Sequence, residues 1–317
     1  MEQKKRFDMG KPIIKYRNPL TGIVQVPKHL TPMQFSRYPS DNAITFERWY
    51  LNLWSNTDQC ERLYLPIQWT ALYCNNGYGN GPIKNTIQRF LNELPKDKKY
   101  YTVVQYDDGI INNIDHLDIK VCAMSGPRID FSLPLLCTPH KVNFIFPAKE
   151  ANKKYKASFI GNLTHSVRAT MIEQLKDKEG YYISTKTHNM HEYCNVLALS
   201  KYVLCPRGYG QSSFRIQEAI QFGAIPIYIS DEFIFPYNMP AFPFGITLGV
   251  EDDIEAAIDY FEKTEQDKII RMCIDANKDL FTYAGCKREI LHYLKNEQSD
   301  NNPANGSAIE QQGGASV

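Results

Sequence analysis

The sequence predicts an α/β protein with two Rossmann-like domains. The chain has 317 residues, a length that suits two domains of ordinary size. In its second half, short buried strands alternate with helices of about ten residues, the pattern of βαβ units around a parallel sheet. Hydrophobic residues make up 43% and charged residues 22%, so a core can form without disulfide or metal support.

The first half contains fewer regular elements. Residues 1 to about 30 show little periodicity and are expected to form an arm. Apolar spacing predicts helices at 43–54 and 83–94, and β-branched or aromatic runs predict strands at 62–66, 100–105, 119–123 and 142–145. The Asn- and Gly-rich run at 75–82 is expected to be a loop.

A short, charged stretch without periodicity at 146–156 predicts the domain boundary. We therefore expect an N-terminal domain at 1–150, a C-terminal domain at 151–285 and a helix at 286–298 that crosses back to the N-terminal domain. The remainder, 299–317, is rich in Asn, Gln, Gly and Ser and is expected to be disordered.

The second half alternates regularly. Strands are predicted at 157–160, 181–184, 202–205 and 225–229, and helices at 166–176, 191–199, 213–222, 251–263, 265–279 and 287–295. In such a sheet, ligands bind beyond the carboxyl ends of the strands, so the loops after the strands are the first places to search for a site.

Charge and composition exclude several classes. The formal net charge is +1, from 36 basic and 35 acidic residues, and no basic stripe indicates nucleic-acid binding. Eight cysteines occur without a CxxC pair, which indicates reduced thiols. The polar N-terminal segment and the absence of a long apolar run indicate no signal peptide or membrane anchor, so we expect a cytoplasmic protein.

The most informative segment is 200–231, where a buried strand leads into a Gly-rich turn and then a helix. Gly208 and Gly210 allow the backbone to approach a ligand closely. Ser212 or Ser213 can cap the helix or donate to a phosphate, and the free N–H groups of a helix start favour phosphate oxygens. The glycine spacing matches neither the dinucleotide fingerprint nor the P-loop.

Charged side chains complete this segment. Arg207 and Arg215 offer forked donors for a diphosphate, and Glu218 stands three residues after Arg215, where it can accept from both hydroxyls of a ribose. Together these groups indicate a nucleoside diphosphate site. The alternative is that Arg215 and Glu218 form an ordinary surface pair on the helix.

These residues also resemble a known family. The run resembles the donor domain of exostosin-like glycosyltransferases, family 47, through Ser200, Lys201, Leu204, Pro206, Gly208, Ser213, Arg215, Glu218, Ala219, Gly223, Ile225 and Pro226. The segment from Phe159 to Gly161, with Arg168, resembles the first strand and helix of that domain. The resemblance covers roughly 155–236 well and the N-terminal half loosely.

The resemblance implies a GT-B type fold, with two Rossmann-like domains facing across a cleft. It implies inverting transfer from a UDP-sugar, with Glu218 on the ribose and Arg215, Arg207 and Arg168 on the diphosphate. The N-terminal domain would then bind the acceptor and the C-terminal domain the donor. The chain departs from the family in lacking an N-terminal membrane anchor, which suggests a microbial or viral member.

An inverting transfer needs a base that takes the proton from the acceptor hydroxyl. Asp107 and Asp108 follow the predicted strand at 100–105, a position where active sites form, and are the candidate base. An ordinary turn capped by Asp is the alternative. Asp115 and His116 are reserves.

No cofactor is expected. The chain contains no Asp-x-Asp motif, so we expect metal-independent catalysis in which arginines and the helix start stabilise the leaving diphosphate. His188 and His191 have a spacing that suits a metal but lack an evident third ligand. His188 follows the strand at 181–184 and is expected near the uracil base.

Aromatic rings can stack on the apolar face of a sugar. Trp69, Tyr73 and Tyr78, with Gln68, are therefore candidates for the acceptor pocket, although Trp69 suits the core equally well. We expect transfer to a glycan hydroxyl, with UDP-xylose as the first donor because no additional basic residue stands out to pair with a uronate. The alternative is a non-catalytic protein that binds carbohydrate or nucleotide on the same fold.

Overall fold

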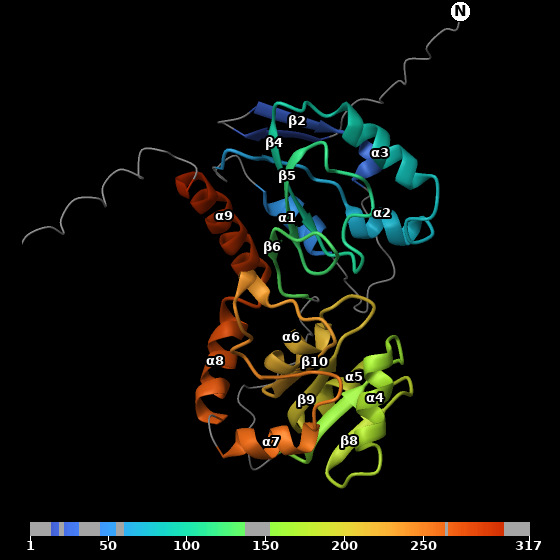
Figure 1. Cartoon of the computed structure of the whole chain (residues 1–317), viewed down its shortest axis with the longest axis vertical. Coiled ribbons are helices and arrows are strands. Elements are labelled where there is room, and N and C mark those ends of the chain that lie inside the picture. Colours follow the sequence, from blue (N-terminus) through green and yellow to red (C-terminus); the bar gives the residue numbers. More distant parts are fainter. Residues whose placement is uncertain are drawn as a thin grey trace, which may run out of the picture.

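The computed structural model describes residues 14–18, 22–31, 45–54, 60–136, 153–263 and 266–300. The strand predicted at 142–145, most of the predicted domain boundary at 146–156 and the predicted tail from residue 301 lie outside these residues. Within them, two separate parallel sheets are seen, one in the upper and one in the lower half of Figure 1.

The N-terminal sheet has four parallel strands in chain order: β3 (Leu63–Tyr64), β4 (Lys99–Val104), β5 (Asp118–Ala123) and β6 (Phe131–Ser132). The helices α1 (Phe46–Leu53), α2 (Trp69–Asn75) and α3 (Ile83–Glu93) belong to the same domain. Five of the six residues of β4 are buried, because a parallel strand between two other layers is covered on both faces.

The predicted arm is in part a hairpin. β1 (Ile14–Asn18) pairs with β2 (Gly22–Val26) in antiparallel register, with Ile14 opposite Val26. A 3-10 turn, Lys28–Leu30, follows. The prediction of an arm without regular structure was wrong here, because five-residue strands are too short to give a clear periodic signal.

The C-terminal sheet has five parallel strands in the order β11-β10-β9-β7-β8. Their bounds are β7 (Tyr155–Ile160), β8 (Tyr181–Ser184), β9 (Ser200–Pro206), β10 (Ile225–Ile229) and β11 (Ile246–Leu248). The helices are α4 (Ser166–Leu175), α5 (Met190–Ala198), α6 (Phe214–Gln221), α7 (Ile254–Glu262) and α8 (Gln266–Lys278). The sequence did not predict β6 or β11, which have only two and three residues.

The order of the C-terminal strands reverses between β7 and β9. After β7 the chain builds β8 on one side, and it then returns to place β9 on the other. The loops that leave β7 and β9 therefore diverge, and in open α/β sheets ligands bind at this point, beyond the carboxyl ends of the strands. The two sheets confirm the predicted α/β class with two parallel-sheet domains.

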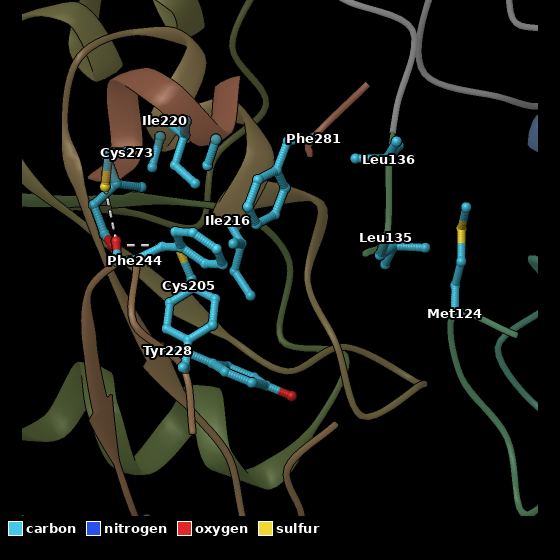
Figure 2. Packing of buried hydrophobic residues seen from close by; sticks show 14 of the residues in the cluster. Met124, Leu135, Leu136, Cys205, Ile216, Ile220, Tyr228, Phe244, Cys273 and Phe281 are labelled. Carbon is cyan, nitrogen blue, oxygen red and sulfur yellow. Dashed lines mark hydrogen bonds between the residues drawn. The ribbon is translucent and has the colours of Figure 1, made fainter. Parts of the chain in front are cut away.

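Part of the core is shared by the two domains. Figure 2 shows Met124, Leu135 and Leu136 of the N-terminal domain on one side of a single buried cluster. Ile216 and Tyr228 lie on the other side, in the C-terminal domain. Burial of apolar side chains is the main favourable term in folding, so this cluster ties the domains together.

The last helix, α9 (Tyr283–Asp300), lies beside the N-terminal domain (Figure 1). Its Glu297 accepts two hydrogen bonds from the Arg62 guanidinium, each 3.1 Å long, and lies 3.0 Å from Lys120 Nζ. Burial alone raises the pKa of Glu297, but these two cations hold it below its usual value. Phe131 and Tyr293 stack with ring centroids 4.6 Å apart.

Among the described residues, no helix has the length and apolar character needed to cross a bilayer.

Glu47 is a fully buried carboxyl group that joins three segments of the N-terminal domain. It accepts hydrogen bonds from Thr70 N at 3.0 Å, Thr70 Oγ1 at 2.7 Å and Gln105 N at 2.9 Å. These bonds attach α1 to the start of α2 and to the end of β4. Burial raises the pKa of Glu47 to about 7, and the three donors offset only part of this effect.

This carboxyl group makes stability depend on pH. Between about pH 4.5 and 7 the folded protein keeps the Glu47 proton while the unfolded chain loses it, so the free energy of unfolding falls as pH rises. We expect wild type to lose about 3 kcal/mol more than Glu47→Gln between pH 4.5 and 8 in urea titrations. Parallel losses in the two proteins would contradict this assignment.

Candidate functional site

The turn between β9 and α6 contains glycines that no other residue can replace without displacing a neighbour. A Cβ added at Gly210 would lie 2.3 Å from Ser125 Oγ, and one at Gly208 would lie 3.2 Å from Arg168 Nη2. The Gly208 N–H donates to Ser212 O at 3.4 Å, which closes the turn. Ser213 then caps α6 by accepting from Arg215 N at 3.4 Å.

Arg215 reaches from α6 to the carboxyl end of β7. Its Nε donates to Ile160 O at 3.0 Å, and its Nη2 donates to the same oxygen. The guanidinium lies 4.9 Å from the centroid of the buried Phe159 ring. A Cβ at Gly161 would lie 2.0 Å from Arg215 Nη2, so the glycine makes room for this side chain.

Arg168 from α4 occupies the same region. Its Nε donates to Arg207 O at 2.9 Å and its Nη1 to Asn162 O at 2.7 Å, and it also lies over Phe159, at 5.9 Å. The pKa of Arg168 is lowered to about 10. Burial is the main cause, and the nearby positive charge of Arg215 acts in the same direction. Neither arginine forms a salt bridge with any described residue, so two cations lie close together without a carboxylate partner.

Arg207 follows β9 and is nine-tenths buried. Its Nη1 lies 2.6 Å from Asp231 Oδ1 and its Nη2 donates to Tyr209 O at 3.3 Å. This contact lowers the pKa of Asp231. The Nε atom is buried and has no hydrogen-bond partner in the part of the chain that the structure describes. Arg207 thus combines a structural ion pair with a donor that an anion can use.

Glu218 is buried on α6, not turned out to solvent as an ordinary surface pair would be. The hydroxyl of the half-buried Tyr193, on α5, donates to its Oε2. The negative charge of Glu218 also affects the nearby Cys194. The pKa of the Cys194 thiol is raised to about 11, mainly by burial and in part by Glu218. A carboxylate is therefore held in place on the same helix as Arg215 by the Tyr193 hydroxyl.

Asp107 lies across from this turn, in the N-terminal domain. A Cβ at Gly210 would lie 3.1 Å from Asp107 Oδ1, so the acid and the glycine turn are neighbours. Burial raises the pKa of Asp107 to about 6, with a further contribution from Asp108, while Arg168 acts in the opposite direction. Asp108 itself is exposed.

A contact between the domains holds the acid and the turn together. Gln211 Oε1 accepts from Ser125 Oγ at 2.6 Å and from Gly126 N at 3.2 Å, and Gln211 N donates to Ser125 Oγ at 3.2 Å. Ser125 follows β5, whose carboxyl end lies next to that of β4. The loops after β4, β5 and β9 therefore meet at one place.

The acceptor candidates are only in part supported. Trp69 and Tyr73 are completely buried, and they donate to Thr102 Oγ1 and Asn112 Oδ1, each at 2.9 Å. We assign both to the core, which corrects their placement in an acceptor pocket, and Gln68 is buried as well. Tyr78 is 57% exposed and remains a candidate.

The reserve bases are engaged elsewhere. Asp115 lies 3.1 Å from Arg128 Nη1, and a ring nitrogen of His116 lies 3.2 Å from Leu91 O. His188 contacts Ser184 Oγ at 2.8 Å and lies 3.7 Å from Glu192, and His191 is exposed. Within the described residues, no three His, Cys, Asp or Glu side chains form a possible metal site.

Sequence reasoning missed several residues of this region. They are Phe159, which supports two guanidinium groups, Tyr193, which bonds Glu218, and the contact pair Ser125 and Gln211. Phe159 was part of the family resemblance, but its contact with the guanidinium groups was not predicted. The others have no sequence signal of their own, since each acts through a neighbour that is distant along the chain. Thr164, in the loop after β7, is a further member with a buried hydroxyl.

The family comparison covers most of this site. Residues 116–240 match the Exostosin GT47 domain, a segment that contains Ser125, all three arginines and Glu218. Asp107 and Asp108 lie outside it.

Among curated proteins, a probable glycosyltransferase of Arabidopsis thaliana is 22% identical over 62% of this chain and 44% of its own length. A probable glucuronosyltransferase of Oryza sativa subsp. japonica is 31% identical over 35% of this chain and 26% of its own. An exostosin-1 homolog of Caenorhabditis elegans is 27% identical over 43% and 45%. The chain spans less than half the length of each of these relatives.

Among solved structures, the GtfA/B complex overlaps 63% of this chain and 46% of that chain, with 14% identity and a TM-score of 0.32. The fold is therefore assigned from the two sheets described above and not from this overlap. The family match and the named relatives confirm the resemblance predicted from the sequence: residues 116–240 are similar to the Exostosin GT47 domain.

Proposed function

We propose that this protein transfers a sugar from a UDP-sugar to a glycan hydroxyl with inversion at the anomeric carbon. One observation carries the proposal: Arg168 and Arg215 lie together without a carboxylate partner among the described residues, at the point where the strand order reverses. A bound diphosphate would supply the missing negative charge, and Glu218, which Tyr193 holds on α6, is proposed to accept hydrogen bonds from the ribose.

The same groups serve the reaction. As the bond between the sugar and the diphosphate breaks, negative charge grows on the leaving oxygen, and donors aimed at that charge lower the barrier. Arg168, Arg207, Arg215 and the start of α6, with Ser212 and Ser213, are proposed to act on this charge. Arginines can do the electrostatic work that a metal ion does in other transferases, so the proposal requires no cofactor.

Asp107 is proposed as the base. It faces the glycine turn of the donor domain, and burial gives it a pKa of about 6, so it is ionised near neutral pH but still able to take a proton. In a single displacement it would remove the proton from the acceptor hydroxyl while that oxygen attacks the anomeric carbon. Tyr78 is proposed to contact the acceptor and His188 the uracil.

The donor sugar is open to a direct comparison. UDP-xylose is the first donor to test, and UDP-glucuronate is the matched alternative because several relatives in Oryza sativa are named as probable glucuronosyltransferases. Mass spectrometry of donor hydrolysis would separate them. Turnover with UDP-glucuronate alone would overturn the choice of xylose.

We also propose that the reaction takes place in the cytoplasm.

Glu218 is expected to set the affinity for the nucleotide. Removing a buried acceptor of ribose hydroxyls in Glu218→Ala should weaken UDP binding by about 1–3 kcal/mol, measured by calorimetry. Glu179→Ala, an exposed acid in the same domain, is the control and should bind UDP as wild type does. Unchanged affinity in Glu218→Ala would refute the ribose assignment.

Asp107 is expected to set the pH dependence. Because the base must be ionised, kcat/KM should fall tenfold per pH unit below about pH 6, and Asp107→Asn should lower turnover by about 10²- to 10⁴-fold while UDP still binds. Asp108→Asn should remain active, with the acid limb moved to lower pH because a neighbouring negative charge is lost.

The result for Asp107 also separates catalysis from binding alone. If wild type binds UDP but neither transfers nor hydrolyses any UDP-sugar, the non-catalytic alternative holds. If Asp107→Asn keeps full turnover and the same acid limb, another group is the base.

A further inference from the structure

The loop between β7 and α4, residues 161–165, contains a buried hydroxyl that the fold does not satisfy. Thr164 Oγ1 is inaccessible to solvent, and no described residue offers it a hydrogen bond. Its backbone N–H is used locally, donating to Asn162 O at 3.0 Å. A buried polar group without a partner destabilises the fold, and such groups are rare in native proteins. The hydroxyl therefore points to a partner that is not part of the described chain.

The position of this hydroxyl is defined by Gly208. A Cβ added there would lie 3.9 Å from Thr164 Oγ1 and 3.2 Å from Arg168 Nη2. The hydroxyl and the guanidinium thus both border the space that the missing side chain of Gly208 leaves. Any other residue at position 208 would occupy this space with its side chain.

The charge around this space favours an anion. Arg168 and Arg215 both stand over Phe159, and Arg207, the residue before Gly208, has its buried Nε without a partner in the described chain. Three guanidinium groups therefore lie where the loops after β7 and β9 come together, and among the described residues one carboxylate, Asp231, forms an ion pair with them. A water molecule can accept one of these bonds, whereas a phosphate group offers several oxygens and the compensating charge.

We propose that the Thr164 hydroxyl donates a hydrogen bond to a phosphate oxygen of the donor nucleotide. The loop after β7 then forms the second wall of a phosphate site whose first wall is the glycine turn after β9. This inference rests on the proposed function, since it takes the nucleotide to be a diphosphate, and it adds a ligand from a different loop. It also explains why Gly208 has no side chain.

The test compares UDP with uridine. Thr164→Val keeps the shape of the side chain and removes the hydroxyl, so UDP should bind roughly 10- to 100-fold more weakly while uridine is unaffected. Thr164→Ser should restore most of the UDP affinity. Thr187→Val, which changes an exposed threonine in the same domain, is the matched control. Calorimetry gives the affinities, and thermal unfolding shows that each variant is folded.

The outcomes distinguish failure of the Thr164 inference from failure of the proposed function. If wild type prefers UDP over uridine and Thr164→Val binds UDP equally well, the Thr164 inference is overturned and the proposed function stands. Equal losses for UDP and uridine, or no rescue by Thr164→Ser, also overturn it, because the effect would then come from packing. If wild type does not prefer UDP over uridine, the proposed function itself fails.

Discussion

The site depends on one electrostatic constraint: the buried guanidinium of Arg168 and the partly buried guanidinium of Arg215 lie close together, and no described carboxylate forms an ion pair with either. Arg168 and Arg215 lie over the same aromatic ring and donate to backbone carbonyls, contacts that fix their geometry but supply no ion pair. The negative charge of Asp107 acts on Arg168 from the opposite domain. Placing like charges together away from water is unfavourable, so the sheet, the glycines and Phe159 hold an arrangement that the side chains alone would avoid. An anion that binds between the loops would relieve this cost, which is why we propose that a phosphate group binds there.

The second requirement is that the two domains meet at this point. The glycine turn packs on the loops after β4 and β5, with Gln211 bonded to Ser125 and Gly126, while the shared core and α9 join the domains elsewhere. Because Gly210 has no side chain, Asp107 can approach the turn from the opposite domain. Burial is the main cause of the raised pKa of Asp107. The glycine turn after β9 and the candidate base Asp107 therefore come together only when both domains are assembled.

Much of this could be predicted from sequence, for a physical reason. The strands and helices of the C-terminal domain have strong periodicity, and the strand, turn and helix around Gly208 keep donor residues close along the chain, so local pattern sufficed. The prediction failed where tertiary packing decides. Trp69 and Tyr73 are aromatic and close to a Gly-rich loop, yet both are core residues. Thr164 and Tyr193 are ordinary in sequence, and their role in the site depends on contacts with residues on other elements. The strands β1, β2, β6 and β11 were too short to give a periodic signal.

The most direct test of the central claim is a crystal structure of the protein with UDP bound. The account predicts density for the diphosphate at the carboxyl ends of β7 and β9, with its oxygens within hydrogen-bond distance of Arg168 and Arg215 and the ribose hydroxyls on Glu218. If UDP instead binds elsewhere, or if its phosphates face solvent while both arginines contact only backbone carbonyls, the account is contradicted.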